Sequence, residues 1–270
     1  MKILAVFALL AIRIFALDIV NGDVVVLKLD KSTSELSFGS KQIPLIAAPN
    51  SGDKIAVLAA NYRAKGDFTL RIVDQSGSRE QIVALKKGEY KQETLSVAPG
   101  KIKPPKEALA RIKRELDEAN AVYAKTTPRY LFVRPFAQPS DSKITSAFGN
   151  ARTFNGEVKS YHSGVDYRAA VGTSVHAVND GVVVIAKDRY YAGGSVVIDH
   201  GGGIYSQYYH LSEIKVSLGD RVGRGDLIAL SGESGRVSGP HLHFGIAING
   251  VSVNPLSFIA KFNETVFGER

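Results

Sequence analysis

Short apolar runs separated by glycine are the dominant pattern of the chain from about Ile144 onward. The runs include Gly181–Ala186, Ser195–Asp199 and Leu227–Leu230. Runs of this length suit strands, and glycines such as Gly201-Gly202-Gly203 supply the tight turns between strands. The pattern predicts an antiparallel β domain that has no helix before the Pro255–Phe262 region.

A second set of short β-rich runs occupies residues 17–100. The runs are Val24–Leu29, Ile55–Ala59, Phe68–Val73, Ile82–Leu85 and Thr94–Val97. Within one of them Phe68, Leu70 and Ile72 alternate with polar residues, as a strand with one buried face requires. We therefore expect a small β-sandwich-like domain over residues 17–100.

A helical segment links the two β regions. Pro104-Pro105 ends the β pattern, and residues 106–124 then carry an apolar stripe at helical spacing, with charges on the other faces. The stripe consists of Leu109, Ile112, Leu116, Ala119 and Tyr123. We expect a linker over residues 101–128, a C-terminal β domain over residues 129–262 and a tail over residues 263–270. The predicted fold class is mainly β.

The first residues have the pattern of an export signal. Lys2 precedes the apolar run Ile3–Ile12, and Ile14-Phe15-Ala16 offers a cleavage site. Ten apolar residues are fewer than the roughly 20 that cross a bilayer. We predict a signal peptide over residues 1–16 and a periplasmic protein with no integral membrane segment after its removal; an uncleaved anchor is the alternative.

The net charge of +8 is confined to the N-terminal half of the chain. Residues 1–139 carry 22 basic and 14 acidic side chains, whereas residues 140–270 carry 12 of each. A nucleic-acid partner is not expected, because the basic residues of the predicted helix alternate with acidic ones and no recognition motif is present.

All six histidines lie in the second half, and the chain has no cysteine. The lack of cysteine excludes thiol catalysis, disulfides, iron–sulfur clusters and cysteine-type zinc sites. Any metal must therefore be held by imidazole and carboxylate groups. The histidines are His162, His176, His200, His210, His241 and His243.

Three short segments carry residues suited to metal chemistry. They are His162-Ser-Gly-Val-Asp166, Tyr208-Tyr-His210-Leu211 and Ser238-Gly-Pro-His241-Leu-His243-Phe244. In a strand, His241 and His243 point to one face while Leu242 points to the other. Two imidazoles on one strand face, together with a histidine and an aspartate from another segment, supply the ligands of a zinc site with one open position.

These segments resemble the lysostaphin-type (LytM-like) zinc peptidoglycan endopeptidases. Flanking sequences agree, and the resemblance covers about residues 144–258 in the order of the family. The flanking sequences are Thr145-Ser-Ala-Phe-Gly149, Gly172-Thr173, Asp180-Gly181, Asp199-His-Gly201 and Gly219-Asp220. Ahead of Ser238-Gly239, the pair Arg236-Val237 departs from the small polar residues usual in the family and is expected to border the substrate groove.

The resemblance implies a role for each matching residue. His162, Asp166 and His243 would bind one zinc ion, which activates a water molecule and polarises the scissile carbonyl. His210 and His241 would be the catalytic pair, of which one transfers protons and the other stabilises the oxyanion. The sequence does not decide which of the two is the main base.

Four further residues are assigned more loosely. Tyr208 is expected on the strand face of His210, where it would orient that histidine or bind substrate. Arg152 would bind a substrate carboxylate or form a structural salt bridge. His176 and His200 are expected to belong to the scaffold.

The expected activity is hydrolysis of peptide cross-links in peptidoglycan. The domain layout resembles Gram-negative members that cut D-Ala–diaminopimelate bonds, which implies a D,D-endopeptidase with D,D-carboxypeptidase activity as an addition. Glycyl-glycine bridges are the alternative substrate, and remodelling of the cell wall and cell shape would follow.

Two other functions compete with this one. A non-catalytic relative would activate another wall hydrolase, but such relatives have lost zinc ligands that are all present here. A biotinyl or lipoyl module would need an acceptor lysine in its exposed turn, where this chain has Asn179-Asp180.

Overall fold

The computed structural model describes residues 17–156 and 158–268. The signal peptide predicted for residues 1–16 lies outside the described residues. Within the described part of the chain, no helix is long and apolar enough to cross a membrane.

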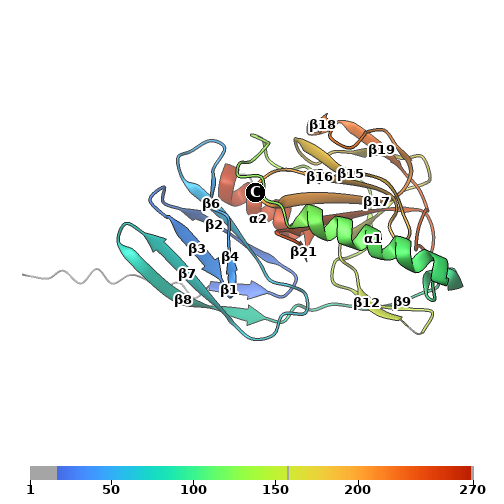
Figure 1. The fold of residues 1–270 in the computed structure, drawn as a ribbon, viewed down its shortest axis with the longest axis horizontal. Coiled ribbons are helices and arrows are strands. Elements are labelled where there is room, and N and C mark those ends of the chain that lie inside the picture. The colour runs from blue at the N-terminus through green and yellow to red at the C-terminus, as the bar shows by residue number, and fades with distance from the viewer. Residues whose placement is uncertain (1–16, 157, 269–270) are drawn as a thin grey trace, which may run out of the picture.

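Residues 17–86 form two facing sheets with a core of their own (Figure 1). The larger sheet consists, in spatial order, of β1 (Leu17–Val20), β8 (Gly77–Lys86), β7 (Phe68–Asp74), β3 (Glu35–Phe38) and β4 (Lys41–Gln42). The smaller sheet consists of β2 (Val24–Leu29), β6 (Lys54–Ala59) and β5 (Ile46–Ala47). Leu36, Leu58 and Leu70 are buried between them, because alternate side chains of each strand face the opposite sheet. The arrangement has the predicted form of a sandwich.

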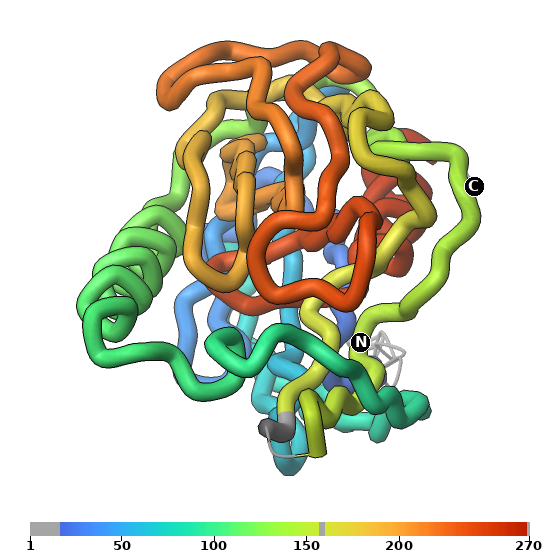
Figure 2. Tube along the Cα trace, turned by 90° about the vertical axis from the view of Figure 1, so that its right-hand side faces the viewer, coloured from blue at the N-terminus to red at the C-terminus, as the bar shows by residue number. Residues whose placement is uncertain are grey.

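The strand β9 (Gln92–Leu95) leaves this sandwich and joins the C-terminal half. It pairs in parallel with β11 (Ala151–Phe154), which forms a hairpin with β12 (Val158–Tyr161). Figure 2 shows the segment after β9, in green, beside the yellow-green hairpin. The expectation that a strand near residues 94–97 belongs to the N-terminal domain is therefore wrong, since its hydrogen-bonding partner is β11.

The C-terminal half is built on one large antiparallel sheet. In spatial order its strands are β10 (Ile144–Ser146), β13 (Val165–Arg168), β20 (His241–Ile248), β17 (Ile204–Ile214), β16 (Gly193–Asp199), β15 (Gly181–Arg189) and β18 (Arg221–Val222). Three strands extend it: β14 (Ser174–His176) pairs with β19 (Leu227–Ser231), β19 pairs with β17, and β21 (Val251–Val253) pairs with β20. The mainly β fold predicted from the sequence is confirmed.

The linker helix packs on one face of this sheet. After a 3-10 turn (Pro99–Lys101), α1 (Lys106–Tyr123) lies across β15, β16 and β17 (Figure 1). Ala119 packs with Ile185 and Tyr205, and the Tyr205 hydroxyl donates to the carbonyls of Val122 and Lys125. Ala119 and Tyr123 of the predicted stripe thus pack on the sheet, as in an amphipathic helix, whereas Leu109 and Leu116 are 51% and 56% exposed, so the stripe covers the sheet only in part.

The helix α2 (Pro255–Phe267) joins the sandwich to the large sheet. Phe258 and Phe262 are buried in a core that also contains Val24 and Ile55 of the sandwich and Ile246 of β20. Lys261 forms an ion pair with Asp23 at this junction. The helix continues five residues beyond the predicted end at Phe262, so residues 263–267 are helical and do not belong to a C-terminal tail.

His200 is a scaffold residue inside the C-terminal core. Its Nδ1–H donates to the carbonyl of Asp180 over 2.8 Å, and the Ser206 hydroxyl lies 2.7 Å from Nε2. The ring also packs against Phe132 and Phe136. Burial lowers the pKa of His200 to about 4.

This buried imidazole should make stability sensitive to acid. The folded-state pKa lies below the value of about 6.5 in the unfolded chain, so the unfolded state binds more protons between these values. Lowering the pH from about 6.5 to about 4 should therefore cost about 3 kcal/mol through this group. His200→Gln should make the pH dependence of the free energy of unfolding shallower in urea titrations. His176→Gln, at a half-buried histidine of the same domain, is the control, and an unchanged dependence in His200→Gln would contradict the assignment.

Candidate metal centre

Three side chains bring one potential ligand atom each to a common point. His162 Nε2 lies 2.8 Å from Asp166 Oδ1, His243 Nδ1 lies 2.9 Å from the same oxygen, and the two nitrogens are 3.0 Å apart. All three side chains are buried. Zinc–ligand bonds of about 2.0–2.2 Å place the ligands of one ion at comparable separations, so this donor set fits zinc. The structure thus brings together the three residues predicted as ligands.

The pairing of β13 with β20 fixes two members of this set. Asp166 lies directly opposite His243, and Arg168 lies opposite His241. His162 joins them from the connection between β12 and β13, which passes close to β20 at Gly164. A Cβ added at Gly164 would lie 2.3 Å from the carbonyl oxygen of Phe244, so only glycine allows this approach.

The buried groups have the protonation states that a metal requires. Burial raises the pKa of Asp166, but its contacts with the imidazoles of His162 and His243 outweigh this effect and hold the pKa well below its usual value. Burial lowers the pKa of His243 to about 4, partly opposed by Asp166. At neutral pH the site therefore holds an ionised carboxylate and a neutral His243 imidazole, the forms that coordinate metals.

A second pair of imidazoles lies beside the three ligand candidates. The rings of His210 and His241 are 4.8 Å apart, and His241 Nε2 is 3.6 Å from Asp166 Oδ1. Nδ1–H of His210 donates to the carbonyl of Ser234, and Nδ1–H of His241 donates to that of Gly239. In a neutral imidazole that donates from Nδ1, the lone pair on Nε2 can accept a proton.

His210 adopts a left-handed backbone conformation, with φ of 64°. Burial, together with the neighbouring His243 and His241, lowers the pKa of His210 well below its usual value. The ring is therefore neutral at pH 7. In a regular extended strand, the side chain of residue 210 would point to the same face as that of residue 208. The positive φ of His210 breaks this alternation and changes the direction of its side chain.

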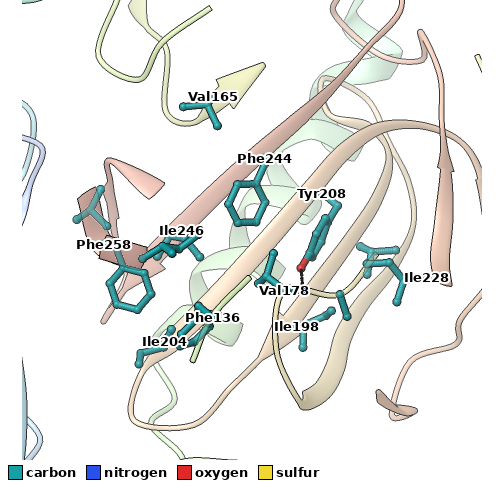
Figure 3. Packing of buried hydrophobic residues seen from close by; sticks show 14 of the residues in the cluster. Phe136, Val165, Val178, Ile198, Ile204, Tyr208, Ile228, Phe244, Ile246 and Phe258 are labelled. Carbon is teal, nitrogen blue, oxygen red and sulfur yellow. Dashed lines mark hydrogen bonds between the residues drawn. The ribbon is translucent and has the colours of Figure 1, made fainter. Parts of the chain in front are cut away.

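Because of this local conformation, the prediction that Tyr208 faces the site with His210 is wrong. Tyr208 is completely buried in the core beside Phe244, and its hydroxyl accepts from the Val178 amide (Figure 3). Tyr209, which the sequence analysis missed, stacks on the ring of His243 at 5.4 Å.

Arg152 is committed to protein carboxylates. Nη2 donates to Asp166 Oδ2 over 2.7 Å, and Nε donates to Glu93 Oε2 over 3.1 Å. The structure therefore favours the salt-bridge alternative for Arg152, and these contacts give no support to a role in binding a substrate carboxylate.

Glu93 of β9 is a site residue that sequence reasoning missed. Besides Arg152, it accepts from the hydroxyl of Ser146 and the amide of Asn150. Ser146 Oγ lies 3.0 Å from Nδ1 of His162, whose Nδ1–H donates to the carbonyl of Ala147. Glu93 thus lies behind two ligand candidates. No local pattern marks it, because its partners are more than 50 residues away.

Two adjacent cavities open at the centre. A cavity of about 350 Å³ contains Asp166 and His241, and one of about 230 Å³ contains His162 and His243. Four residues line both cavities, namely Arg152, Phe154, His210 and Arg236. The prediction that Arg236 and Val237 border a groove at the site is confirmed.

Comparison with known proteins identifies the domain that carries this centre. The sequence profile of Peptidase family M23 matches residues 160–255. Two curated relatives from Vibrio cholerae are the peptidoglycan DD-endopeptidases ShyA, 46% identical over 95 residues, and ShyB, 34% identical over 150 residues. The DD-carboxypeptidase/endopeptidase Mpg of Neisseria meningitidis is 42% identical over 96 residues.

The matches to ShyA, ShyB and Mpg cover 35%, 55% and 36% of this chain, respectively. They cover only 22%, 34% and 22% of the length of those three relatives. A solved structure from Pseudomonas aeruginosa, described as a candidate M23 peptidase, extends the likeness to the fold. It is 28% identical, covers 90% of this chain and 95% of its own, and has a TM-score of 0.69. The profile match and the donor set agree in position, and the chain carries a domain of Peptidase family M23 over residues 160–255.

Proposed function

We propose that the chain is a zinc-dependent peptidase that hydrolyses peptide cross-links in peptidoglycan. The observation that carries this proposal is the convergence of His162 Nε2, Asp166 Oδ1 and His243 Nδ1 beside the pair His210 and His241. The three converging atoms form a catalytic type of zinc site, because three protein ligands leave a coordination position open.

The substrate class follows from the relatives. Those named above are called peptidoglycan DD-endopeptidases or a DD-carboxypeptidase/endopeptidase. The proposed bond is therefore that between D-Ala and diaminopimelate, with D,D-carboxypeptidase activity on the same stems, and the proposed location is the periplasm of a Gram-negative bacterium. Remodelling of the wall and of cell shape would follow from this activity.

In the proposed reaction, the metal ion and the imidazoles of His210 and His241 have separate roles. Zinc held by His162, Asp166 and His243 would polarise the scissile carbonyl and lower the pKa of the attacking water to about 7. One of His210 and His241 accepts a proton from that water at Nε2 and delivers it to the leaving nitrogen. The other, by hydrogen bonding, stabilises the oxyanion of the tetrahedral intermediate.

Arg152 and Glu93 hold the carboxylate ligand in place. Arg152 binds Oδ2 of Asp166 and leaves Oδ1 directed at the two imidazoles. Glu93 neutralises Arg152 and, through Ser146, reaches the far nitrogen of His162. Outer contacts of this kind orient metal ligands and affect metal affinity.

Removal of one ligand should abolish both metal binding and activity. His243→Ala should leave the chain without a stoichiometric zinc ion and without cleavage of cross-linked muropeptide dimers, because two ligands cannot retain zinc. The wild type treated with a chelator should behave alike and recover on addition of zinc. Zinc content and dimer-to-monomer conversion are the measurements. Undiminished conversion in His243→Ala would refute the mechanism, whereas a wild type without zinc or activity would favour the activator alternative.

The two auxiliary histidines should separate binding from catalysis. His210→Ala and His241→Ala should each retain zinc but lose about 10²- to 10⁴-fold in turnover, since a positioned proton-transfer group contributes this much. His176→Gln, outside the site, controls for loss of a histidine. Loss of zinc from either alanine variant would instead make that residue a ligand.

The contribution of Glu93 can be measured by metal affinity alone. Glu93→Gln leaves the Arg152 guanidinium uncompensated near the zinc position and free to compete for Asp166. The affinity for zinc should fall about tenfold, as for other outer contacts of metal ligands. Competition with a chromogenic chelator gives the affinity, and Glu89→Gln at an exposed glutamate near the same strand is the matched control. Equal affinities in the three proteins would show that Glu93 has no part in the site.

A further inference from the structure

Arg236 is a cation at the site that has no anionic partner within the described residues. The cavity of about 350 Å³ is lined by four charged side chains, Glu93, Arg152, Asp166 and Arg236. Arg152 is paired with both carboxylates, and the ion pairs found in residues 17–156 and 158–268 do not include Arg236. With zinc bound, the site would carry a net positive charge, and the guanidinium of Arg236 would be its available anion-binding group.

Two aromatic rings hold this guanidinium in a fixed position. Cζ of Arg236 lies 4.4 Å from the centroid of Phe154 on β11 and 4.6 Å from that of Tyr191 in the turn between β15 and β16. The backbone amide of Arg236 also donates to the carbonyl of Tyr191 over 2.8 Å. A guanidinium that lies over aromatic rings can still donate from its N–H groups to a planar carboxylate.

The position of Arg236 places these donors next to the reacting groups. Arg236 lines both cavities at the centre, the one that Asp166 and His241 line and the one that His162 and His243 line. His210 also lines both cavities. An anion held by Arg236 would therefore belong to the part of the substrate close to the bond that is cut.

The proposed substrates share a carboxylate at that place. In a D-Ala–diaminopimelate cross-link, the carbon that bears the leaving nitrogen also bears a free carboxylate. In a stem that ends in D-Ala-D-Ala, the leaving residue likewise carries its carboxylate on the carbon attached to the leaving nitrogen. A glycyl-glycine bridge has an amide at this position instead.

We propose that Arg236, packed against Phe154 and Tyr191, is a specificity-determining residue that binds the carboxylate on the carbon attached to the leaving nitrogen. This inference rests on the proposed function and narrows its substrate class. It selects D,D-endopeptidase and D,D-carboxypeptidase substrates against glycyl-glycine bridges, since a half-buried cation left without an anion disfavours a substrate with an uncharged group at this position.

The test compares two synthetic cross-linked dimers that differ at one group. In the first dimer the carboxyl next to the leaving nitrogen is free, and in the second it is a carboxamide. The full chain should cleave the free acid with a kcat/KM about 10- to 100-fold higher, the range expected for a charge-assisted bidentate contact. In Arg236→Gln, kcat/KM for the free-acid dimer should fall by this factor, whereas kcat/KM for the carboxamide dimer should change little. For the free-acid dimer, Arg236→Lys should have a kcat/KM between those of the wild type and Arg236→Gln, because the lysine ammonium is not planar.

Arg221→Gln removes one exposed positive charge from β18, outside both cavities, and should match the wild type on both dimers. Melting temperature and zinc content identify a variant that is merely misfolded. Equal cleavage of the two dimers by the wild type, or an equal loss on both in Arg236→Gln, would overturn the inference and leave the proposed function intact. A gain on both dimers would also overturn it, because Arg236 would then obstruct the groove. Cleavage of neither dimer by the zinc-loaded wild type would overturn the proposed function, and the inference with it.

Discussion

The site depends on the contacts that the two oxygens of the Asp166 carboxylate make on opposite sides of the group. Oδ1 faces the imidazoles of His162 and His243, and Oδ2 accepts from Arg152. A buried carboxylate is costly unless hydrogen bonds and opposite charges compensate it. Here both oxygens are satisfied, so the group stays ionised and its orientation is fixed. The pairing of β13 with β20 then places His243 opposite Asp166 without any adjustable loop.

The M23 domain does not supply this environment alone. Residues 160–255 contain the three ligand candidates and the two auxiliary histidines, but Arg152 and Ser146 precede this range and Glu93 comes from β9. The core likewise runs from α2 into the strands β2 and β6. The N-terminal segment is therefore a structural part of the site, both through β9 and through the shared core.

Local sequence patterns predicted those features that depend on neighbouring residues. The strand Val24–Leu29 has the predicted bounds, and the helix predicted for residues 106–124 begins at Lys106 and ends at Tyr123. His241 and His243 point to the same face of β20, and Leu242 points to the opposite face, where it is buried. This follows from the alternation of side chains along the strand. The family resemblance added their partners, His162 and Asp166, which alternation alone could not select.

Features that depend on one unusual dihedral angle or on distant pairing escaped prediction. The positive φ of His210 ends the alternation that would have placed Tyr208 in the site, and Tyr209 contacts His243 instead. Glu93 meets Arg152 only because β9 pairs with β11, a contact between segments 59 residues apart. Such pairing follows from the tertiary fold, and periodicity within a window of the sequence does not reveal it.

The most direct test of the metal centre is anomalous scattering at the zinc edge from crystals of the full chain. One strong peak should lie within bonding distance, about 2.0–2.2 Å, of His162 Nε2, Asp166 Oδ1 and His243 Nδ1. Glu93 and Arg152 should remain paired behind Asp166. Zinc bound at another place, or ligated by His210 or His241 in place of one of these three, would contradict the account.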